Sequence, residues 1–243
     1  MPRPFDDNVR PLVNESARNQ DSTFELKYFG LHGMAETCRL ILATSGAKWE
    51  AVFPSDWANV EKKDTFFGVL PTLYETTSSG QVIEIPESGA IENYLAQKFQ
   101  LLGEDAWDEI KIRAFASSCQ AVSTFYFLRV ATIRDQPEYK ATMLARFLNE
   151  AVATFVPVQE MHLNANQNNG HYVGNKLSLA DLRLSIAVHT IVSLTEDKFV
   201  SESKTPGIWA VYQKVNSIPS YVEWRQTAAY KTIAEGNLRI VGV

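Results

Sequence analysis

The sequence has few cysteines, no excess of basic residues and no long hydrophobic run. Its two cysteines, Cys38 and Cys119, lie far apart and form neither a metal-binding cluster nor a disulfide framework. A reducing, cytoplasmic setting is therefore expected, with no metal ion. The 23 Lys and Arg against 28 Asp and Glu give a net charge of −5, which argues against nucleic acid as a partner. No segment approaches the roughly 20 apolar residues of a membrane-spanning helix, so no membrane association is expected.

The chain is long enough for two modest domains, with 243 residues of which 45% are hydrophobic. Residues 1–22 hold three prolines among mixed charges and no apolar stretch of the kind found in signal peptides, so they are predicted to be a flexible arm. Residues 101–106 contain Gly103 and are predicted to be a linker. The two domains are then expected at residues 23–100 and 107–243.

The first domain begins with a strand, a helix and a second strand. Residues 24–29 (FELKYF) alternate as a strand does, and a break at residues 30–33 precedes a helical pattern over residues 34–45. Residues 49–53 indicate another strand, and residues 56–63 a short helix or loop.

The rest of this domain predicts a hairpin followed by a helix. Residues 72–74 and 81–85 alternate as strands, and residues 77–80 (TSSG) supply turn chemistry between them. Apolar residues then recur at helical spacing, at Ile91, Tyr94, Leu95 and Phe99. The order βαβαββα predicts an α/β domain with a thioredoxin-like fold and a mixed sheet.

Two adjacent residues at the start of that helix suit the two ends of one α-amino acid. Ser88 stands at the cap or in the first turn, where free backbone N–H groups and the helix dipole favour a carboxylate. Glu87 can hold an ammonium group by charge-assisted hydrogen bonds. Taken singly, each residue has an ordinary alternative, a helix cap for Ser88 and a solvated acid for Glu87.

Leu70 precedes a proline, which favours an extended backbone. Its N–H and C=O groups would then be available to pair with an extended peptide. A cis bond between Leu70 and Pro71 would turn this edge into a fixed ledge for a ligand.

A V-L-P turn, a hairpin and an E-S pair in this order resemble the cytosolic glutathione transferases. In that superfamily a [Q/E]-S pair binds the γ-glutamyl end of glutathione, and the residue before a cis-proline binds its cysteinyl backbone. The resemblance assigns these roles to Glu87 and Ser88, and to Leu70 with Pro71.

A second motif, L-K-Y-F-x-x-x-G-x-A-E-x-x-R-L-I-L, is similar to the sigma-type pattern L-x-Y-F-x-x-R-G-R-A-E-x-x-R-x-I, in which the tyrosine is catalytic. That tyrosine is Tyr28, at the end of the first strand, where open α/β sheets bind ligands. A phenol there can donate a hydrogen bond to a thiolate and lower the thiol's pKa from about 8.5 by about 2 units. The alternative is an ordinary strand aromatic. His32 and Met34 stand where the pattern has arginines.

The resemblance also assigns the glycyl carboxylate of glutathione. A tryptophan at the position of Trp57 and a lysine about one turn later hold this carboxylate in the sigma-type pattern. Lys62 is the expected lysine, with Lys63 close behind, and a packing tryptophan with solvated lysines is the alternative. Val69 stands where relatives have a lysine, which places more of the binding on Trp57 and Lys62.

The second domain is helical throughout its length. Helices are predicted over residues 107–133, 137–163, 178–193, 205–216 and 219–230, giving an all-α bundle. Ser178 and Asp181 form a capping box that resembles the one in the C-terminal domain of the same superfamily. By the resemblance, this domain carries the second-substrate site.

The resemblance spans residues 24–230 and implies a glutathione transferase that joins the glutathione thiolate to an apolar electrophile, as a homodimer. An isomerase or peroxidase would use the same glutathione site. A non-catalytic binding, structural or regulatory protein is a third alternative, favoured by Met34 and Val69, which remove cations near the site. The combination of Tyr28 with Glu87 and Ser88 argues against it, because a protein that is not selected for glutathione binding has little reason to keep a phenol and an amino-acid clamp together. The fold alone does not decide between these functions.

Overall fold

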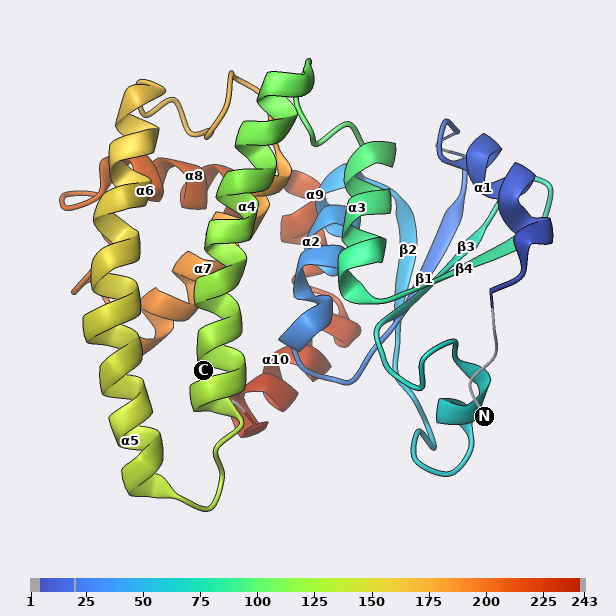
Figure 1. Cartoon of the computed structure of the whole chain (residues 1–243), viewed down its shortest axis with the longest axis horizontal. Helices are drawn as coiled ribbons and strands as arrows, with labels where there is room; N and C mark the ends of the chain where they lie inside the picture. Colours follow the sequence, from blue (N-terminus) through green and yellow to red (C-terminus); the bar gives the residue numbers. More distant parts are fainter. Residues whose placement is uncertain (1–4, 20, 241–243) are drawn as a thin grey trace. The chain divides into compact units, whose positions relative to one another are not determined.

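A computed structural model describes residues 5–19 and 21–240 (Figure 1). The chain divides into two compact units. One contains the residues up to Gln100 together with Pro219–Gly236, and the other contains Leu101–Ile218 together with the residues from Asn237 on.

The first unit contains a mixed four-stranded sheet in the order β2-β1-β3-β4. Its strands are β1 (Thr23–Lys27), β2 (Lys48–Val52), β3 (Thr72–Thr76) and β4 (Val82–Pro86). β1 runs parallel to β2 and antiparallel to β3, and β3 runs antiparallel to β4. The predicted α/β architecture is confirmed.

Helices α2 (Glu36–Ser45) and α3 (Ser88–Lys98) pack side by side against one face of this sheet (Figure 1). Alternate strand residues point to opposite faces, so one set on each strand is buried beneath the helices. This buried set includes Phe24, Leu26, Leu73 and Ile83. Short 3-10 turns, η2 (Gly33–Ala35) and η3 (Glu61–Asp64), lie in the loops after β1 and β2.

The prediction of a flexible arm is wrong for the described part of residues 1–22. Asp7–Val9 form the 3-10 turn η1, and Arg10–Ser16 form the helix α1. The Ser16 hydroxyl donates a hydrogen bond to Glu75, which lies in β3. This long-range polar contact orders a segment whose prolines and charges predict no structure by themselves. Residues 1–4 and 20 lie outside the described part of the chain.

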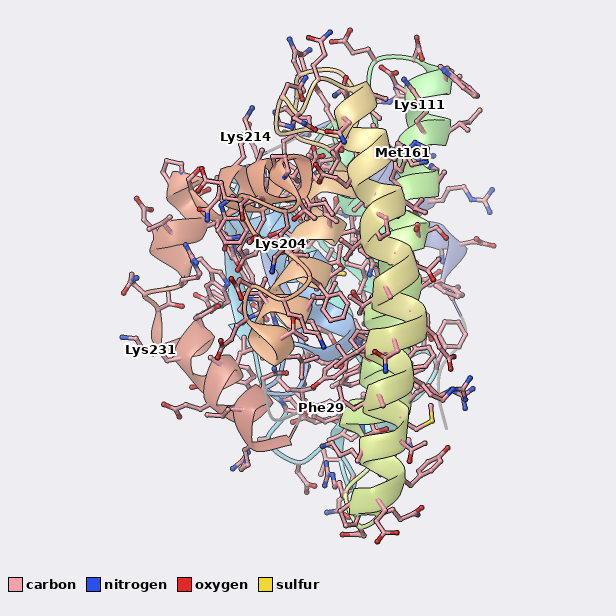
Figure 2. The ribbon with its side chains drawn as sticks, turned by 90° about the vertical axis from the view of Figure 1, so that its left-hand side faces the viewer. Phe29, Lys111, Met161, Lys204, Lys214 and Lys231 are labelled. Carbon is pink, nitrogen blue, oxygen red and sulfur yellow. The ribbon has the colours of Figure 1, made fainter. Side chains whose placement is uncertain are left out.

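The second unit is a bundle of helices, as predicted. Its elements are α4 (Ala106–Tyr126), η4 (Phe127–Ala131), α5 (Pro137–Arg146), η5 (Phe147–Val152), α6 (Ala153–Ala165), α7 (Leu179–Thr195) and α8 (Pro206–Asn216). The turns η4 and η5 are π-helical and continue the neighbouring α-helices without a break. Figure 2 shows α6 with Met161 and α4 with Lys111 near the same end of the bundle.

The capping box at the start of α7 is present. The Ser178 N–H donates to the Asp181 carboxylate at 2.9 Å, and the Tyr172 N–H donates to it at 2.8 Å. His171 Nδ1 lies 3.1 Å from the same carboxylate. Asp181 is fully buried and thereby fixes both the helix start and the loop before it.

The end of the chain corrects the expected division into domains. The helix predicted over residues 219–230 is two helices, α9 (Pro219–Trp224) and α10 (Ala228–Ile240). Trp224 packs against Trp49 of β2, with ring centroids 4.4 Å apart, so these residues belong with the sheet. A Cβ atom at Gly236 would lie 1.7 Å from the Gly30 carbonyl oxygen, which explains why α10 has a glycine there.

Candidate functional site

Four strand ends form one row at the edge of the sheet. Val52 pairs with Lys27, Lys27 with Thr72, and Thr72 with Pro86. Each of these residues is the first or last of its strand. The residues that adjoin them in the chain therefore gather at a single edge.

Five of the seven predicted site residues adjoin this row. Tyr28 directly follows Lys27, Leu70 and Pro71 directly precede Thr72, and Glu87 and Ser88 directly follow Pro86. The strand register therefore brings together residues that are far apart in the sequence. The outermost of them, Tyr28 and Ser88, are 60 positions apart.

The Tyr28 side chain is only 6% exposed, and its hydroxyl accepts a hydrogen bond of 3.1 Å from the Met34 N–H. No other hydrogen bond of this hydroxyl occurs within the described residues, so its own proton is available for donation. Burial raises the pKa of Tyr28 above its ordinary value, against the opposing effects of the Met34 N–H and the Arg39 charge. The phenol is therefore protonated at neutral pH and able to donate a hydrogen bond.

The loop that follows Tyr28 is held by a buried arginine. The guanidinium of Arg39 donates to the backbone carbonyls of Leu31 at 2.8 Å, Phe29 at 3.1 Å and His32 at 3.2 Å. It also lies 5.4 Å from the centroid of the Tyr28 ring. Arg39 thus supplies a fixed positive charge beside the phenol.

Arg39 also forms an ion pair with Glu36, three residues before it in the same helix. That ion pair is present at 3.4 Å, but the Arg39 side chain is 1% exposed and its main contacts are with backbone carbonyls. The apolar residues on either side of Arg39 in α2 are the sequence signal that could have indicated its burial.

Glu36 completes this buried cluster. Its carboxylate lies 2.7 Å from His32 Nδ1 and 3.4 Å from Arg39 Nη1. Burial by itself would raise the pKa of Glu36, but His32 and Arg39 outweigh that effect and lower it from 4.5 to about 2. His32, which stands where the sigma-type pattern has an arginine, therefore contributes to the structure of the loop.

Gly33 is required for the loop to close on the Tyr28 hydroxyl. Its φ angle is +45°, and a Cβ atom there would lie 2.7 Å from the Tyr28 hydroxyl oxygen. Any side chain at this position would therefore displace either the phenol or the Met34 N–H group that donates a hydrogen bond to it.

The peptide bond between Leu70 and Pro71 is cis. Neither the N–H nor the C=O group of Leu70 is hydrogen-bonded to another described residue. A backbone donor and a backbone acceptor next to the sheet edge are thus available for pairing.

Glu87 is the N-cap residue of α3, and Ser88 is the first residue of the helix. Glu87 has φ 67° and ψ 124°, and its side chain makes no capping hydrogen bond. Non-glycine residues with positive φ are uncommon and concentrate at binding sites. Because Ser88 is not the cap, the capping alternative does not explain it. Cys38 Sγ donates to the Ser88 carbonyl at 3.6 Å, which connects α2 to the start of α3.

Trp57 reaches this edge through an aromatic chain. Its ring meets the edge of Phe29 at 5.9 Å between centroids, and Phe29 meets Tyr28 at 5.4 Å. The Lys62 N–H donates to the Trp57 carbonyl at 3.1 Å, which joins η3 to the same loop. Lys62 and Lys63 are both exposed, and neither ammonium forms an ion pair with a described residue.

Among the described residues, no cluster of histidine, cysteine and acidic side chains could hold a metal ion. In the same part of the chain, no helix combines the length and the apolar character needed to cross a membrane.

Comparison with known proteins gives one consistent family. The family model described as the C-terminal domain of glutathione S-transferase matches residues 125–228. A glutathione S-transferase of Gallus gallus is 25% identical over 210 residues, covering 85% of this chain and 90% of the relative. S-crystallin SL11 of Nototodarus sloanii is 22% identical over 211 residues, covering 86% and 99%.

Among solved structures, the sigma class glutathione transferase of Fasciola hepatica superposes with a TM-score of 0.72 at 22% identity. The match covers 86% of this chain and 99% of that one. The predicted fold, a thioredoxin-like domain followed by a helical domain, is confirmed by this likeness. The sequence matches, the family model and the fold agree, so this chain is similar to the glutathione S-transferases over most of its length.

Proposed function

We propose that this protein joins the thiolate of glutathione to an apolar electrophile at the row of strand ends. The observation that carries the proposal is the register of β1, β3 and β4, in which Lys27, Thr72 and Pro86 lie side by side. A phenol, a cis-proline ledge and a helix start adjoin that row, and glutathione offers a thiol, an extended peptide backbone and an α-amino acid.

Glutathione binds along the sheet edge in this proposal. Glu87 takes the γ-glutamyl ammonium, and Ser88 with the N-terminal N–H groups of α3 takes its carboxylate. Leu70 pairs with the cysteinyl backbone next to Pro71. Trp57 and Lys62 hold the glycyl carboxylate.

Tyr28 stabilises the thiolate by donating its phenolic hydrogen. The Met34 N–H that this hydroxyl accepts polarises the phenol, and the Arg39 charge favours negative charge close by. Lowering the thiol's pKa by about 2 units corresponds to roughly 3 kcal/mol of preference for the thiolate. Catalysis then consists of this activation together with the proximity of the two reactants.

Arg39 supplies a positive charge near the phenol although Met34 does not. The sigma-type pattern has an arginine at the position of Met34, but in this chain the Met34 backbone contacts the phenol and the nearby cation comes from α2. The absence of the patterned arginine is therefore compatible with thiol activation.

A second candidate function is non-catalytic binding on the same fold. Val69, 40% exposed, leaves the loop before Leu70 without the lysine of the relatives, and one relative is named a crystallin rather than a transferase. A glutathione-dependent isomerase or peroxidase would use the same thiolate. A homodimer is the expected assembly.

The experiment compares conjugation rates of wild type, Tyr28→Phe and Tyr74→Phe with glutathione and a generic aromatic electrophile. Loss of a hydrogen bond to a charged thiolate should lower kcat/KM of Tyr28→Phe by roughly 10- to 100-fold. Tyr74 is a half-buried tyrosine of the same sheet outside the site, so its variant serves as the matched control. Full activity of Tyr28→Phe would overturn the proposed role, and glutathione binding without turnover in wild type would favour the binding protein.

A further inference from the structure

The segment that precedes the first strand contacts the sheet unit at two separate points. One point is the end of α1, at Ser16 and Asn19, and the other is Phe5. The turn η1 and most of the helix α1 lie between the two contacts. The match to the Fasciola hepatica structure covers 99% of that chain but only 86% of this one, so this chain is the longer of the two.

The first contact is a buried charge cluster. The side chains of Lys98 and Glu75 are both 0% exposed and form an ion pair at 2.9 Å. Lys98 Nζ also donates to the Ser16 carbonyl at 2.5 Å and to the Asn19 carbonyl. All three hydrogens of the ammonium group therefore have acceptors, two of them on this segment.

The carboxylate side of the cluster is equally well satisfied. The Ser16 hydroxyl donates to Glu75 Oε1, and the Tyr94 hydroxyl donates to Oε2 at 2.5 Å. Removing the segment would leave a buried ammonium and a buried carboxylate short of partners, so the end of α1 is firmly attached.

The second contact joins the segment to a loop of the proposed site. Phe5 stacks on Phe66 with ring centroids 4.6 Å apart and an interplanar angle of 19°. It also meets the edge of Phe67 at 5.8 Å. Phe66 and Phe67 lie between Lys62 and Leu70, the residues proposed to hold the glycyl and cysteinyl parts of glutathione.

Part of that loop is exposed where Phe5 meets it. Its first part is held by an ion pair of 2.8 Å between Lys27 and Glu61 and by the Thr65 hydroxyl, which donates to the Lys62 carbonyl at 3.1 Å. Further along, Phe67 is 51% exposed and Val69 40% exposed. A loop that buries little apolar surface opens easily, and a stacked aromatic partner reduces that tendency.

We propose that residues 5–19 act as a strap, in which Phe5 is a positioning residue for glutathione binding. The buried charge cluster anchors one end of the strap, and Phe5 holds the loop from Phe66 to Val69 at the other. Phe5 acts through Phe66 and has no contact with the ligand. This inference rests on the proposed function, because it concerns the loop between Lys62 and Leu70.

The kinetic test uses Phe5→Ala, with Phe5→Tyr as the conservative variant and Val9→Ala as a control in the same segment. Val9 is 38% exposed and has no aromatic contact within the described residues. Losing one stacked aromatic pair should raise the KM for glutathione roughly three- to tenfold. The kcat and the KM for the electrophile should stay within about twofold, and Phe5→Tyr should restore the KM for glutathione.

Hydrogen exchange on the unliganded protein tests the strap without reference to glutathione. Phe5→Ala should speed amide exchange in residues 61–70 and leave exchange in α3 unchanged, because Lys98 keeps its partners. If exchange in residues 61–70 is the same in Phe5→Ala as in wild type, the strap is refuted. If exchange quickens and wild type fails to bind glutathione, the proposed function fails and the strap stands. If exchange quickens, wild type binds glutathione and the KM is unchanged, the positioning role of Phe5 is refuted.

Discussion

The two ends of the four-stranded sheet differ in whether their polar groups have hydrogen-bond partners. Near the end where β1 begins, Lys98 and Glu75 are buried, and every ammonium hydrogen and both carboxylate oxygens are paired. At the end where β1 stops, the Tyr28 proton and the backbone groups of Leu70 have no partner among the described residues. One end is saturated and the other is open.

The paired groups at one end stabilise the fold, whereas the unpaired groups at the other end belong to the proposed site. Burying an unpaired polar group is costly, so it persists only where something else satisfies the group. The saturated end contributes to folding and attaches α1. At the open end, Arg39 and Gly33 fix the loop beside the Tyr28 hydroxyl without using its proton.

The largest expected effect comes from breaking the saturated end. Lys98→Ala leaves the Glu75 carboxylate buried without its cation, so the free energy of unfolding should fall by about 3–5 kcal/mol. Urea denaturation followed by circular dichroism measures this change.

The matched control replaces both partners, with Lys98→Met and Glu75→Leu combined. Two apolar side chains of similar size leave no buried charge, so part of the lost stability should return. The remainder should stay lost, because Ser16, Asn19 and Tyr94 no longer have their hydrogen-bond partners. A loss below about 1 kcal/mol for Lys98→Ala alone would show that the cluster is not the anchor inferred here.

Acid should lower the free energy of unfolding by protonating Glu36, which lies near the open end of the sheet. The pKa of Glu36 is lowered to about 2 in the folded protein from 4.5. Because the folded pKa is below the unfolded one, the stabilisation is complete above about pH 4.5 and is lost as the pH falls towards 2, by roughly 3 kcal/mol. Unfolding free energies measured across this range should therefore decline less steeply for Glu36→Gln than for wild type. Equal slopes would contradict the assignment.

A smaller effect distinguishes binding from capping at Ser88. Ser88→Ala should weaken glutathione binding roughly tenfold, because the carboxylate loses one charge-assisted hydrogen bond. Its unfolding free energy should change by less than about 0.5 kcal/mol, because Glu87 is the N-cap residue. Calorimetric titration and urea denaturation measure the two quantities. A stability loss without an affinity loss would restore the capping interpretation.

Local sequence patterns were sufficient for most of the fold. The alternation in residues 72–74 and 81–85 correctly gives the hairpin of β3 and β4, and the apolar spacing after Ser88 gives α3. These signals are local, because the side-chain period and the turn residues between two strands decide the structure together.

Long-range contacts decide what sequence patterns miss. The helix α1 owes its attachment to Glu75 and Lys98, whose positions in the chain are remote from it. Residues 219–230 read as helical, but their pattern does not say that Trp224 packs against Trp49 of the sheet unit. At the site, Arg39 is buried against backbone carbonyls of the loop just before its own helix, and the helical spacing of the sequence does not show this.

The most direct test of the central claim is an ultraviolet difference titration of bound glutathione in wild type and Tyr28→Phe. The account predicts that the thiolate absorbance of wild type appears well below pH 8, and that Tyr28→Phe shifts its midpoint upward by about 2 units. A bound thiol that titrates in wild type as it does in water would contradict thiol activation at the open end of the sheet.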